Sequence, residues 1–393
     1  MWYNNRNAAI VRLDRLIQRR KFGKGAISIL RIWYNHTMCG ENLTTKTVLQ
    51  DLPGPLLAWY RANARDLPWR RTTDPYQIWV SEIMLQQTRV AAVLGYYARF
   101  LETFPTVEAL AAAPEERLMK LWEGLGYYSR ARNLQKAARI VAEQGGRFPD
   151  TYQDLLALPG VGDYTASAIA SAAFGRREAA VDGNVLRVVM RLTDCRDDIA
   201  DPKVKKAVRA QIQAVMPEAE ADIRVFNQAT MELGATVCGP NRTPDCPRCP
   251  CAAHCLGYAH GTAAALPAKL PKREKRQEEK TVFILQCNGC FALRRRPPKG
   301  LLAGLWEFPN VPGTLAPEAA IGLLGDWNLR PSELEKSITR KHIFTHIVWE
   351  MRGIYAQVRE KAPEFTWMTP GEIDTQAALP TAFRLFWEET EHV

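Results

Sequence analysis

Two segments of the chain each combine a glycine-rich turn with one acidic residue. The residue types in these segments, and the spacing between them, are typical of sites that carry out a reaction. Residues 158–166 read Leu-Pro-Gly-Val-Gly-Asp-Tyr-Thr-Ala, so Pro and Gly stop one helix and another begins at Asp163. Backbone N–H groups at such a helix N-terminus can hold a phosphate, although chance loops of this kind are common. Residues 181–185 place Asp182 before a Gly turn and a new apolar helix. A phosphate-binding turn followed by a positioned acid predicts chemistry on a nucleic acid.

A second candidate site is a group of cysteines. Nine cysteines are present, an odd number, and five of them lie within residues 238–255. This clustering favours a metal or iron–sulfur site in a reducing compartment over a disulfide framework. The spacing, with gaps of seven, two and five residues, selects Cys238, Cys246, Cys249 and Cys255. Thiolates at this spacing can hold an iron–sulfur cluster or, with Cys251 or His254 as a substitute ligand, a zinc ion.

Length and charge restrict the class of protein. With 393 residues the chain has room for two or three domains, and no apolar run approaches the roughly 20 residues that cross a bilayer. A net charge of +10 suits a polyanionic partner. However, residues 1–50 hold nine Lys and Arg against two acidic residues, so they contribute +7 and the rest of the chain only +3. Bulk charge is therefore weak evidence for DNA binding by the folded body.

From residue 53 to residue 266 the sequence reads as a series of helices. Apolar residues recur every three or four positions, Pro or Gly separates the segments, and nothing alternates like a strand. These elements must position the two glycine-rich turns and the cysteines. We predict helices over 56–63, 76–90, 92–104, 115–121, 131–143 and 164–174.

After a stretch rich in Lys, Arg and Glu the pattern changes. Asn288-Gly289 is typical of a tight hairpin turn, and Cys287 and Cys290, which flank it, are expected to be structural. We predict strands over 281–286, 291–294 and 347–357 and helices over 316–324 and 381–390, which together form an α+β domain.

The chain is therefore expected to be multidomain. The predicted parts are a basic N-terminal extension (1–50), an all-α body (51–266) with the cysteine loop (238–255), a charged linker (267–280) and the α+β domain (281–393). For the N-terminal part, a targeting peptide or a DNA-binding arm is an alternative.

The glycine-rich turns and two further motifs closely resemble adenine DNA glycosylases of the MutY type. These belong to the helix-hairpin-helix, endonuclease III-like superfamily. The further motifs are Trp-Val-Ser-Glu-Ile-Met-Leu-Gln-Gln-Thr at 79–88 and Gly-Leu-Gly-Tyr-Tyr at 124–128. The resemblance runs from about residue 53 to the C-terminus. It implies removal of adenine mispaired with 8-oxoguanine, and of adenine opposite guanine, from double-stranded DNA.

The resemblance also implies a cofactor and a lesion-reading domain. Family members hold a [4Fe–4S] cluster on the cysteines at 238, 246, 249 and 255, although their first gap is six residues and this one is seven. Residues 300–309 match the signature of a Nudix-like domain that senses 8-oxoguanine. In this chain Thr345 and His346 stand in the family's Phe-Ser-His loop, with Thr in place of Ser. Without clustered glutamates, this domain is expected to read the lesion and not to hydrolyse it.

Cleavage of an N-glycosidic bond needs a proton for the leaving base and negative charge near the cation-like sugar. Glu82 lies in an apolar helix that should favour its protonated form. The resemblance implies that it donates this proton to adenine N7. The alternative is an ordinary surface glutamate. Asp182 should stay ionised and stabilise the sugar; a helix-capping role is its alternative, and the two roles can coexist. Asn184 should orient either the carboxylate or the sugar. Tyr164 occupies the place of a Schiff-base lysine in bifunctional relatives, so strand cleavage should be weak or absent; plain packing is its alternative.

The remaining assignments concern contacts with DNA. An enzyme that acts on a base in a duplex must flip it out and fill the gap. By resemblance Gln87 and Tyr127 are the wedge residues, with Thr88 and Leu125 beside them. Gly160, Val161 and Gly162 form the phosphate-binding turn. The residues that match the adenine pocket are Trp69, Arg70 and Gln228. For Tyr127 and Trp69 a core position is the alternative, and for Arg70 a solvated surface position.

We therefore predict a monofunctional adenine DNA glycosylase that acts as a monomer on double-stranded DNA and has no membrane partner. It would lie in the cytoplasm with the nucleoid in a bacterium, and in the nucleus or mitochondrion in a eukaryote. The alternatives are an endonuclease III-type glycosylase and lyase, and a catalytically silent iron–sulfur module that binds DNA.

Overall fold

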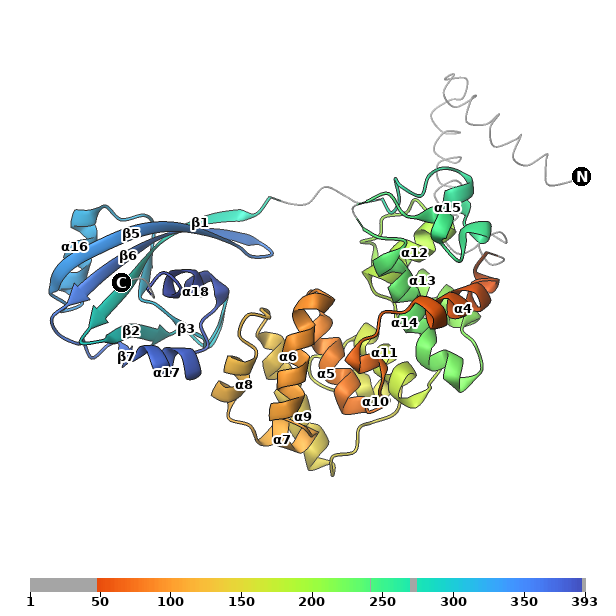
Figure 1. Ribbon diagram of the computed structural model, residues 1–393, viewed down its shortest axis with the longest axis horizontal. Helices are drawn as coiled ribbons and strands as arrows, with labels where there is room; N and C mark the ends of the chain where they lie inside the picture. Colours follow the sequence, from red (N-terminus) through yellow and green to blue (C-terminus); the bar gives the residue numbers. More distant parts are fainter. Residues whose placement is uncertain (1–47, 241, 269–273, 391–393) are drawn as a thin grey trace, which may run out of the picture. The chain divides into compact units, whose positions relative to one another are not determined.

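The structure, a computed structural model, describes residues 48–240, 242–268 and 274–390 (Figure 1). The basic extension therefore lies almost entirely outside the described residues. The chain divides into two units: unit 1 is Met1–Asp66 with Ala170–Leu270, and unit 2 is Leu67–Ile169 with Pro271–Val393. The body expected over 51–266 thus contributes to both units, and each unit is described by itself.

Unit 1 is built around helix α12, whose residues from Val185 to Leu192 are all buried. This helix packs against α14, which in turn packs against α4. The apolar side chains of these helices form one core with the buried Cys251 and Cys255. The helices of unit 1 are α4 (Pro53–Asn63), α12 (Gly183–Leu192), α13 (Pro202–Val215), α14 (Glu220–Thr236), α15 (Leu256–Ala259) and the 3₁₀ turns η2 (Cys246–Arg248) and η3 (Ala252–His254).

The first part of unit 2 is also helical. Asp74, Thr106 and Thr151 cap helices through their side chains, and large aromatic residues such as Trp79, Phe100 and Trp122 are fully buried. The elements are η1 (Pro68–Arg70), α5 (Pro75–Leu85), α6 (Val90–Thr103), α7 (Val107–Ala112), α8 (Glu115–Leu121), α9 (Ser129–Glu143), α10 (Tyr152–Leu156) and α11 (Asp163–Phe174), whose last turn belongs to unit 1.

The single helix predicted over 76–90 is wrong. Helix α5 ends at Leu85 and α6 begins at Val90. Gln87, between them, has a φ of 58°, a left-handed conformation that ends a helix. No Gly or Pro marks this break, so the sequence pattern did not reveal it.

The second part of unit 2 is a mixed sheet with helices on both faces (Figure 1). The strand order is β3-β2-β1-β6-β5, with β4 on β1 and β7 on β2; β1 and β6 are parallel and the other pairs antiparallel. The elements are β1 (Arg276–Cys287), β2 (Cys290–Arg295), β3 (Trp306–Glu307), β4 (Asn310–Pro312), α16 (Pro317–Asp326), β5 (Pro331–Ile343), β6 (Ile347–Val358), β7 (Thr366–Met368), α17 (Pro370–Thr375) and α18 (Thr381–Trp387).

Alternating side chains of β1 enter two separate cores. Val282 and Ile284 pack with Phe383 of α18, whereas Phe283 and Leu285 pack with Leu324 of α16. Because successive side chains of a strand point to opposite faces, α18 covers one face of the sheet and α16 the other. The all-α body and the C-terminal domain of strands and helices agree with the predicted fold class.

Two features of the C-terminal domain differ from the prediction. β1 begins at Arg276, inside the stretch expected to be a linker, because its polar residues pair with β6 from Ile347 onward. The indole of Trp349 donates to Glu278 at 2.7 Å, which shows that this charged segment has specific partners. β5 was not expected at all. It is an exposed edge strand rich in charge, and such strands lack the apolar alternation that identifies a strand.

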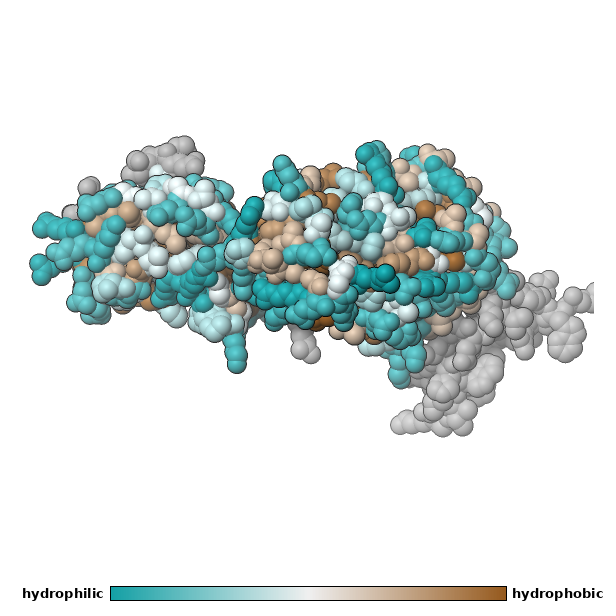
Figure 2. Space-filling view, turned by 90° about the horizontal axis from the view of Figure 1, so that it is seen from below, coloured by the Kyte–Doolittle hydropathy of each residue, from teal (hydrophilic) through white to brown (hydrophobic). Residues whose placement is uncertain are grey.

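Hydrophilic residues cover most of the face shown in Figure 2. In the part of the chain that the structure describes, no helix combines the length and the apolar character needed to cross a membrane.

Candidate active site

Glu82 lies on α5 in an apolar setting. Its neighbours Trp79, Ser81 and Ile83 are at most 2% exposed, and Pro75 with the Asp74 cap fixes the start of the helix. Glu82 itself is half-buried, and its oxygen Oε2 is fully buried. The desolvated setting expected from the sequence is therefore present on one side of the carboxyl group.

In the helical part of unit 2, two loops hold a non-glycine residue in the left-handed conformation. Gln87, which is exposed, follows α5 with a φ of 58°, and Tyr127, which is 47% exposed, precedes α9 with a φ of 46°. Such conformations cost free energy and tend to be kept at functional sites. Thr88 is half-buried beside Gln87, whereas Leu125 is buried at 5% exposure. The exposed Tyr127 does not occupy the core position that was its alternative.

The predicted phosphate-binding turn joins α10 to α11. Gly160 has a φ of 78°, and a Cβ there would lie 2.7 Å from the Cβ of Asn133, so only glycine fits. Val161 is buried and anchors the turn, while Gly162 is exposed. Tyr164 is the second residue of α11 and is half-buried. The arrangement is a pair of short helices around an exposed backbone turn.

In unit 1, Asp182 caps α12 with both carboxylate oxygens. Oδ1 accepts hydrogen bonds from the backbone N–H groups of Asn184 and Val185 at 2.9 and 2.8 Å. Oδ2 accepts one from the side-chain amide of Asn184 at 2.6 Å. The residue is half-buried. These three bonds fix the orientation of the carboxylate and of Asn184 at the positive end of the helix.

Sequence reasoning missed a buried arginine behind this pair. Arg187 donates from Nη2 to Oδ1 of Asn184 at 2.8 Å and to the carbonyl of Gly234 at 2.6 Å. Its Nε donates to the carbonyl of Cys238 at 2.8 Å. Arg187 thus joins Asn184 to α14 and to the cysteine loop. An arginine inside the apolar run from Val185 to Leu192 was the signal that could have revealed it.

The predicted adenine-pocket residues fall in both units. Trp69 is 6% exposed and packs edge-on against Tyr97 at 5.3 Å, and Arg70 is half-buried; both belong to η1 in unit 2. Gln228 belongs to α14 in unit 1, where its Oε1 accepts a hydrogen bond from the hydroxyl of Tyr60 at 2.8 Å. Glu82 also lies in unit 2 and Asp182 in unit 1, so each unit holds one of the two candidate acids.

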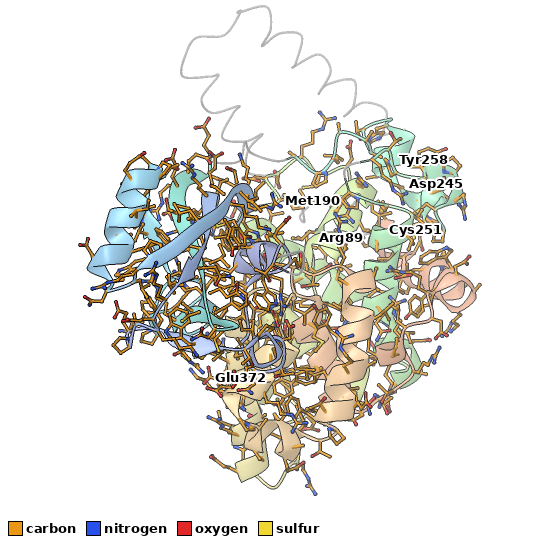
Figure 3. All side chains as sticks on the ribbon, turned by 60° about the vertical axis from the view of Figure 1, so that its left-hand side comes forward. Arg89, Met190, Asp245, Cys251, Tyr258 and Glu372 are labelled. Atoms are coloured by element: carbon orange, nitrogen blue, oxygen red, sulfur yellow. The ribbon has the colours of Figure 1, made fainter. Side chains whose placement is uncertain are left out.

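The four predicted ligand cysteines of unit 1 line one small cavity, together with side chains of α12, α14 and α15. Cys251 is absent from this lining; it is buried in the unit 1 core, as is Met190 (Figure 3). Arg191 donates from Nη1 to the Sγ atom of Cys238 at 3.3 Å. Burial raises the pKa of the Cys238 thiol above its usual range. Among the described residues, no group of three or more His, Cys, Asp or Glu is arranged so that it could hold a metal ion.

Thr345 and His346 lie exposed in the loop between β5 and β6. The backbone of this loop is held by the N–H of Arg276, which donates to the carbonyl of His346 at 3.0 Å. The hydroxyl groups of Thr345 and Tyr127 are 2.7 Å apart and share a hydrogen bond. The structure therefore brings the predicted lesion-sensing loop to a predicted wedge residue within unit 2.

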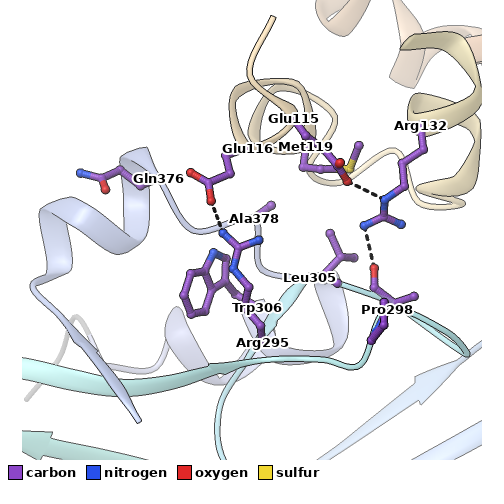
Figure 4. Close-up of a pocket in the computed structure, with 12 residues that line it drawn as sticks. Glu115, Glu116, Met119, Arg132, Arg295, Pro298, Leu305, Trp306, Gln376 and Ala378 are labelled. Atoms are coloured by element: carbon purple, nitrogen blue, oxygen red, sulfur yellow. Dashed lines mark hydrogen bonds and ion pairs between the residues drawn. The ribbon is translucent and has the colours of Figure 1, made fainter. Parts of the chain in front are cut away.

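A pocket of about 350 Å³ in unit 2 contains none of the predicted site residues (Figure 4). Arg132 donates to Glu115 at 2.8 Å and to the carbonyl of Ala303 at 2.7 Å, and Arg295 pairs with Glu116. These contacts join α8 and α9 to the C-terminal domain. The four charged side chains that line this pocket therefore pair with one another.

Two family models match the chain in separate regions. Residues 80–214 match the HhH-GPD superfamily base excision DNA repair protein family, and residues 281–389 match the NUDIX domain. The first region contains both candidate acids.

The individual proteins that the chain resembles are also DNA glycosylases. The chain is 36% identical over 403 residues to an adenine DNA glycosylase of Homo sapiens, covering 85% of this chain and 73% of that protein. It is 43% identical over 208 residues to an adenine DNA glycosylase of Mycobacterium tuberculosis (strain CDC 1551 / Oshkosh), covering 52% and 67%. The solved structure of a thermostable thymine-DNA glycosylase is 31% identical, with a TM-score of 0.50, covering 55% of this chain and 99% of that one.

Proposed function

The chain belongs to the adenine DNA glycosylase family, and from this premise we propose that it removes adenine mispaired with 8-oxoguanine, or with guanine, from double-stranded DNA. Removal of a base is the first step of base excision repair. The enzyme would act as a monomer wherever the genome lies, in the nucleoid, nucleus or mitochondrion.

The observation that carries the proposal is the fixed carboxylate of Asp182. Its three hydrogen bonds come from groups within three residues, so the carboxylate keeps its orientation without help from the substrate. A preorganised negative charge stabilises a sugar that becomes cation-like as the glycosidic bond breaks. Asn184, held by Arg187, keeps the carboxylate in place.

The second group is Glu82. A carboxyl group with a buried oxygen favours the neutral form that can donate a proton. In our proposal Glu82 protonates the departing adenine at N7 while Asp182 stabilises the sugar of the same nucleotide. Trp69, Arg70 and Gln228 would line the adenine pocket. Tyr164 cannot form a Schiff base, so the enzyme should not cut the strand.

The exposed loops of unit 2 would open the duplex. Gln87 and Tyr127 are the proposed wedges, with Thr88 and Leu125 beside them, and the turn at 160–162 would hold a backbone phosphate. The hydrogen bond between Tyr127 and Thr345 supports a role for Thr345 and His346 in reading 8-oxoguanine, because it places a hydroxyl of the sensing loop beside a wedge.

We also propose a [4Fe–4S] cluster on Cys238, Cys246, Cys249 and Cys255. All four cysteines line one cavity, and thiolates at short spacing are the usual ligands of an iron–sulfur cluster. The Arg191 contact with the Cys238 sulfur suits a thiolate ligand. The cluster would supply structural support, anchoring the loop that Arg187 joins to Asn184.

Single-turnover cleavage of duplexes with adenine opposite 8-oxoguanine, guanine or cytosine tests the function. We expect adenine release from the first two and little from the third. Asp182→Asn should slow release by about 100-fold or more, because it removes the charge under the sugar.

Asp201→Asn is the matched control. Asp201 caps α13 through one oxygen as Asp182 caps α12, and Asn is as good a cap as Asp. Both variants should keep the unfolding midpoint of the wild type, and Asp201→Asn should keep its rate. Equal rates for the two variants would refute the role of Asp182, and a wild-type protein that releases no adenine would refute the function.

A further inference from the structure

Arg130 joins the two loops that carry the proposed wedges. It is the second residue of α9 and is only 8% exposed. Its Nη1 donates to the carbonyl groups of Ile83, Met84 and Gln86 at 2.8, 2.9 and 2.6 Å. Its Nη2 donates to those of Leu125 and Gly126 at 2.9 and 3.1 Å. One guanidinium group therefore binds the end of α5 and the loop before α9.

The bound carbonyl groups lie next to the strained residues. Gln86 immediately precedes Gln87, and Gly126 immediately precedes Tyr127; both wedges have a positive φ. The Gly126 carbonyl also accepts a hydrogen bond from the indole of Trp122 at 3.1 Å. The last carbonyl groups of a helix such as α5 have no partner within the helix. Arg130 supplies those partners and a positive charge at the helix C-terminus.

Arg130 also contacts the wedge side chain itself. Its Cζ lies 5.6 Å from the ring centre of Tyr127 and 5.4 Å from that of Trp122. Its burial lowers the pKa of the guanidinium to about 10, which leaves it charged at neutral pH. A charged group buried at this cost must be held by many partners.

We propose that Arg130 is a positioning residue that fixes the distance between the Gln87 and Tyr127 loops, so that both wedges enter the duplex together when a base is flipped. This inference rests on the proposed function, whose wedges it positions. Lysine cannot replace it, because an ammonium group lacks the planar fork that reaches two loops at once.

The test compares adenine that must be extruded with adenine that is already unpaired. Arg130→Lys should slow release from a pair with 8-oxoguanine by about tenfold or more, since a small misplacement of positioning groups has effects of this size. Release of adenine opposite an abasic site should fall by less than about threefold, because an unpaired base costs less to flip. An equal loss on both substrates, or no loss on either, would overturn the proposal.

Arg139→Lys is the matched control on the same helix. Arg139 is exposed, and its Nε donates to the Ala111 carbonyl at 3.3 Å. This variant should cleave both substrates at the wild-type rate.

Gly126→Ala tests the same inference if Arg130→Lys does not fold. Gly126 has a φ of 69°, and an added Cβ would meet no atom within 4 Å, so the change acts on the backbone alone. It should redirect the carbonyl that Arg130 binds and produce the same substrate-dependent loss. Wild-type rates on both duplexes would contradict the proposal.

A fluorescence measurement separates this inference from the proposed function. The duplex carries 2-aminopurine in place of the adenine, and its emission rises when the base leaves the stack. In an Asp182→Asn background, Arg130→Lys should slow this rise by about tenfold. An unchanged rise would refute the role of Arg130 even if adenine is released, whereas a wild-type protein that flips the base without releasing it would refute only the proposed reaction.

Discussion

Gly234→Ala tests whether the close approach of α12 and α14 positions the catalytic pair. A Cβ at residue 234 would lie 2.8 Å from the Cβ of Asn184 and 3.1 and 3.2 Å from its backbone oxygen and Cα. Ordinary contacts begin near 3.4 Å, so the helices must separate by about 0.6 Å. The backbone of Asn184 cannot move away without moving the Asp182 cap with it.

The expected effects on stability and on rate differ in size. Overpacking costs about 1–3 kcal/mol, and alanine returns about 1 kcal/mol of helix propensity, so the net loss of stability is about 0–2 kcal/mol. A displacement of this order in the group that holds the Asp182 carboxylate should slow adenine release by about 10- to 100-fold.

Single-turnover rates and urea unfolding, measured on the same preparations, give both quantities. Gly322→Ala is the control, because Gly322 lies in α16 and its added Cβ meets no atom within 4 Å. That variant should gain up to about 1 kcal/mol and keep its rate. A Gly234→Ala protein with the wild-type rate would show that this contact does not position Asn184.

Three further predictions follow from other groups. Tyr164→Lys should allow borohydride to trap a covalent adduct with DNA, because an amine beside the sugar can form a Schiff base. If no adduct forms under conditions that release adenine, residue 164 does not lie beside the sugar. Thr345→Ala should narrow the preference for 8-oxoguanine over guanine opposite adenine, since it removes the hydroxyl that faces Tyr127; an unchanged ratio of rates excludes the loop as a sensor. Burial lowers the pKa of His342 below 6.5, so the unfolded chain binds a proton at this residue more tightly than the folded protein does. The free energy of unfolding should therefore fall as the pH drops below about 6.5. In urea unfolding between about pH 5 and 7, His342→Gln should make the free energy of unfolding less dependent on pH, and an unaltered pH dependence would contradict this role of His342.

Much of the local structure of the candidate site was predictable, because it depends on short segments of sequence. The cap at Asp182 needs only an acid before a turn and an apolar helix, and the turn at 160–162 needs only Pro and Gly between helices. The break after α5 was not predictable in this way. Gln87 adopts its left-handed conformation next to the Gln86 carbonyl, which Arg130 binds from 44 residues further along the chain, and no residue near Gln87 marks this conformation.

The sequence by itself determined the fold class and supplied the candidate acids at 82 and 182 and the candidate ligand cysteines, since helix periodicity, capping and ligand spacing are properties of short segments. Only the tertiary structure decided which buried arginines connect these segments. Arg187 and Arg191 stand out only as charges in an apolar run, Arg130 does not stand out at all, and the partners of all three are carbonyl groups and side chains supplied by distant parts of the chain. Hydrogen bonds of this kind leave no periodic pattern, because each partner is set by packing and not by spacing.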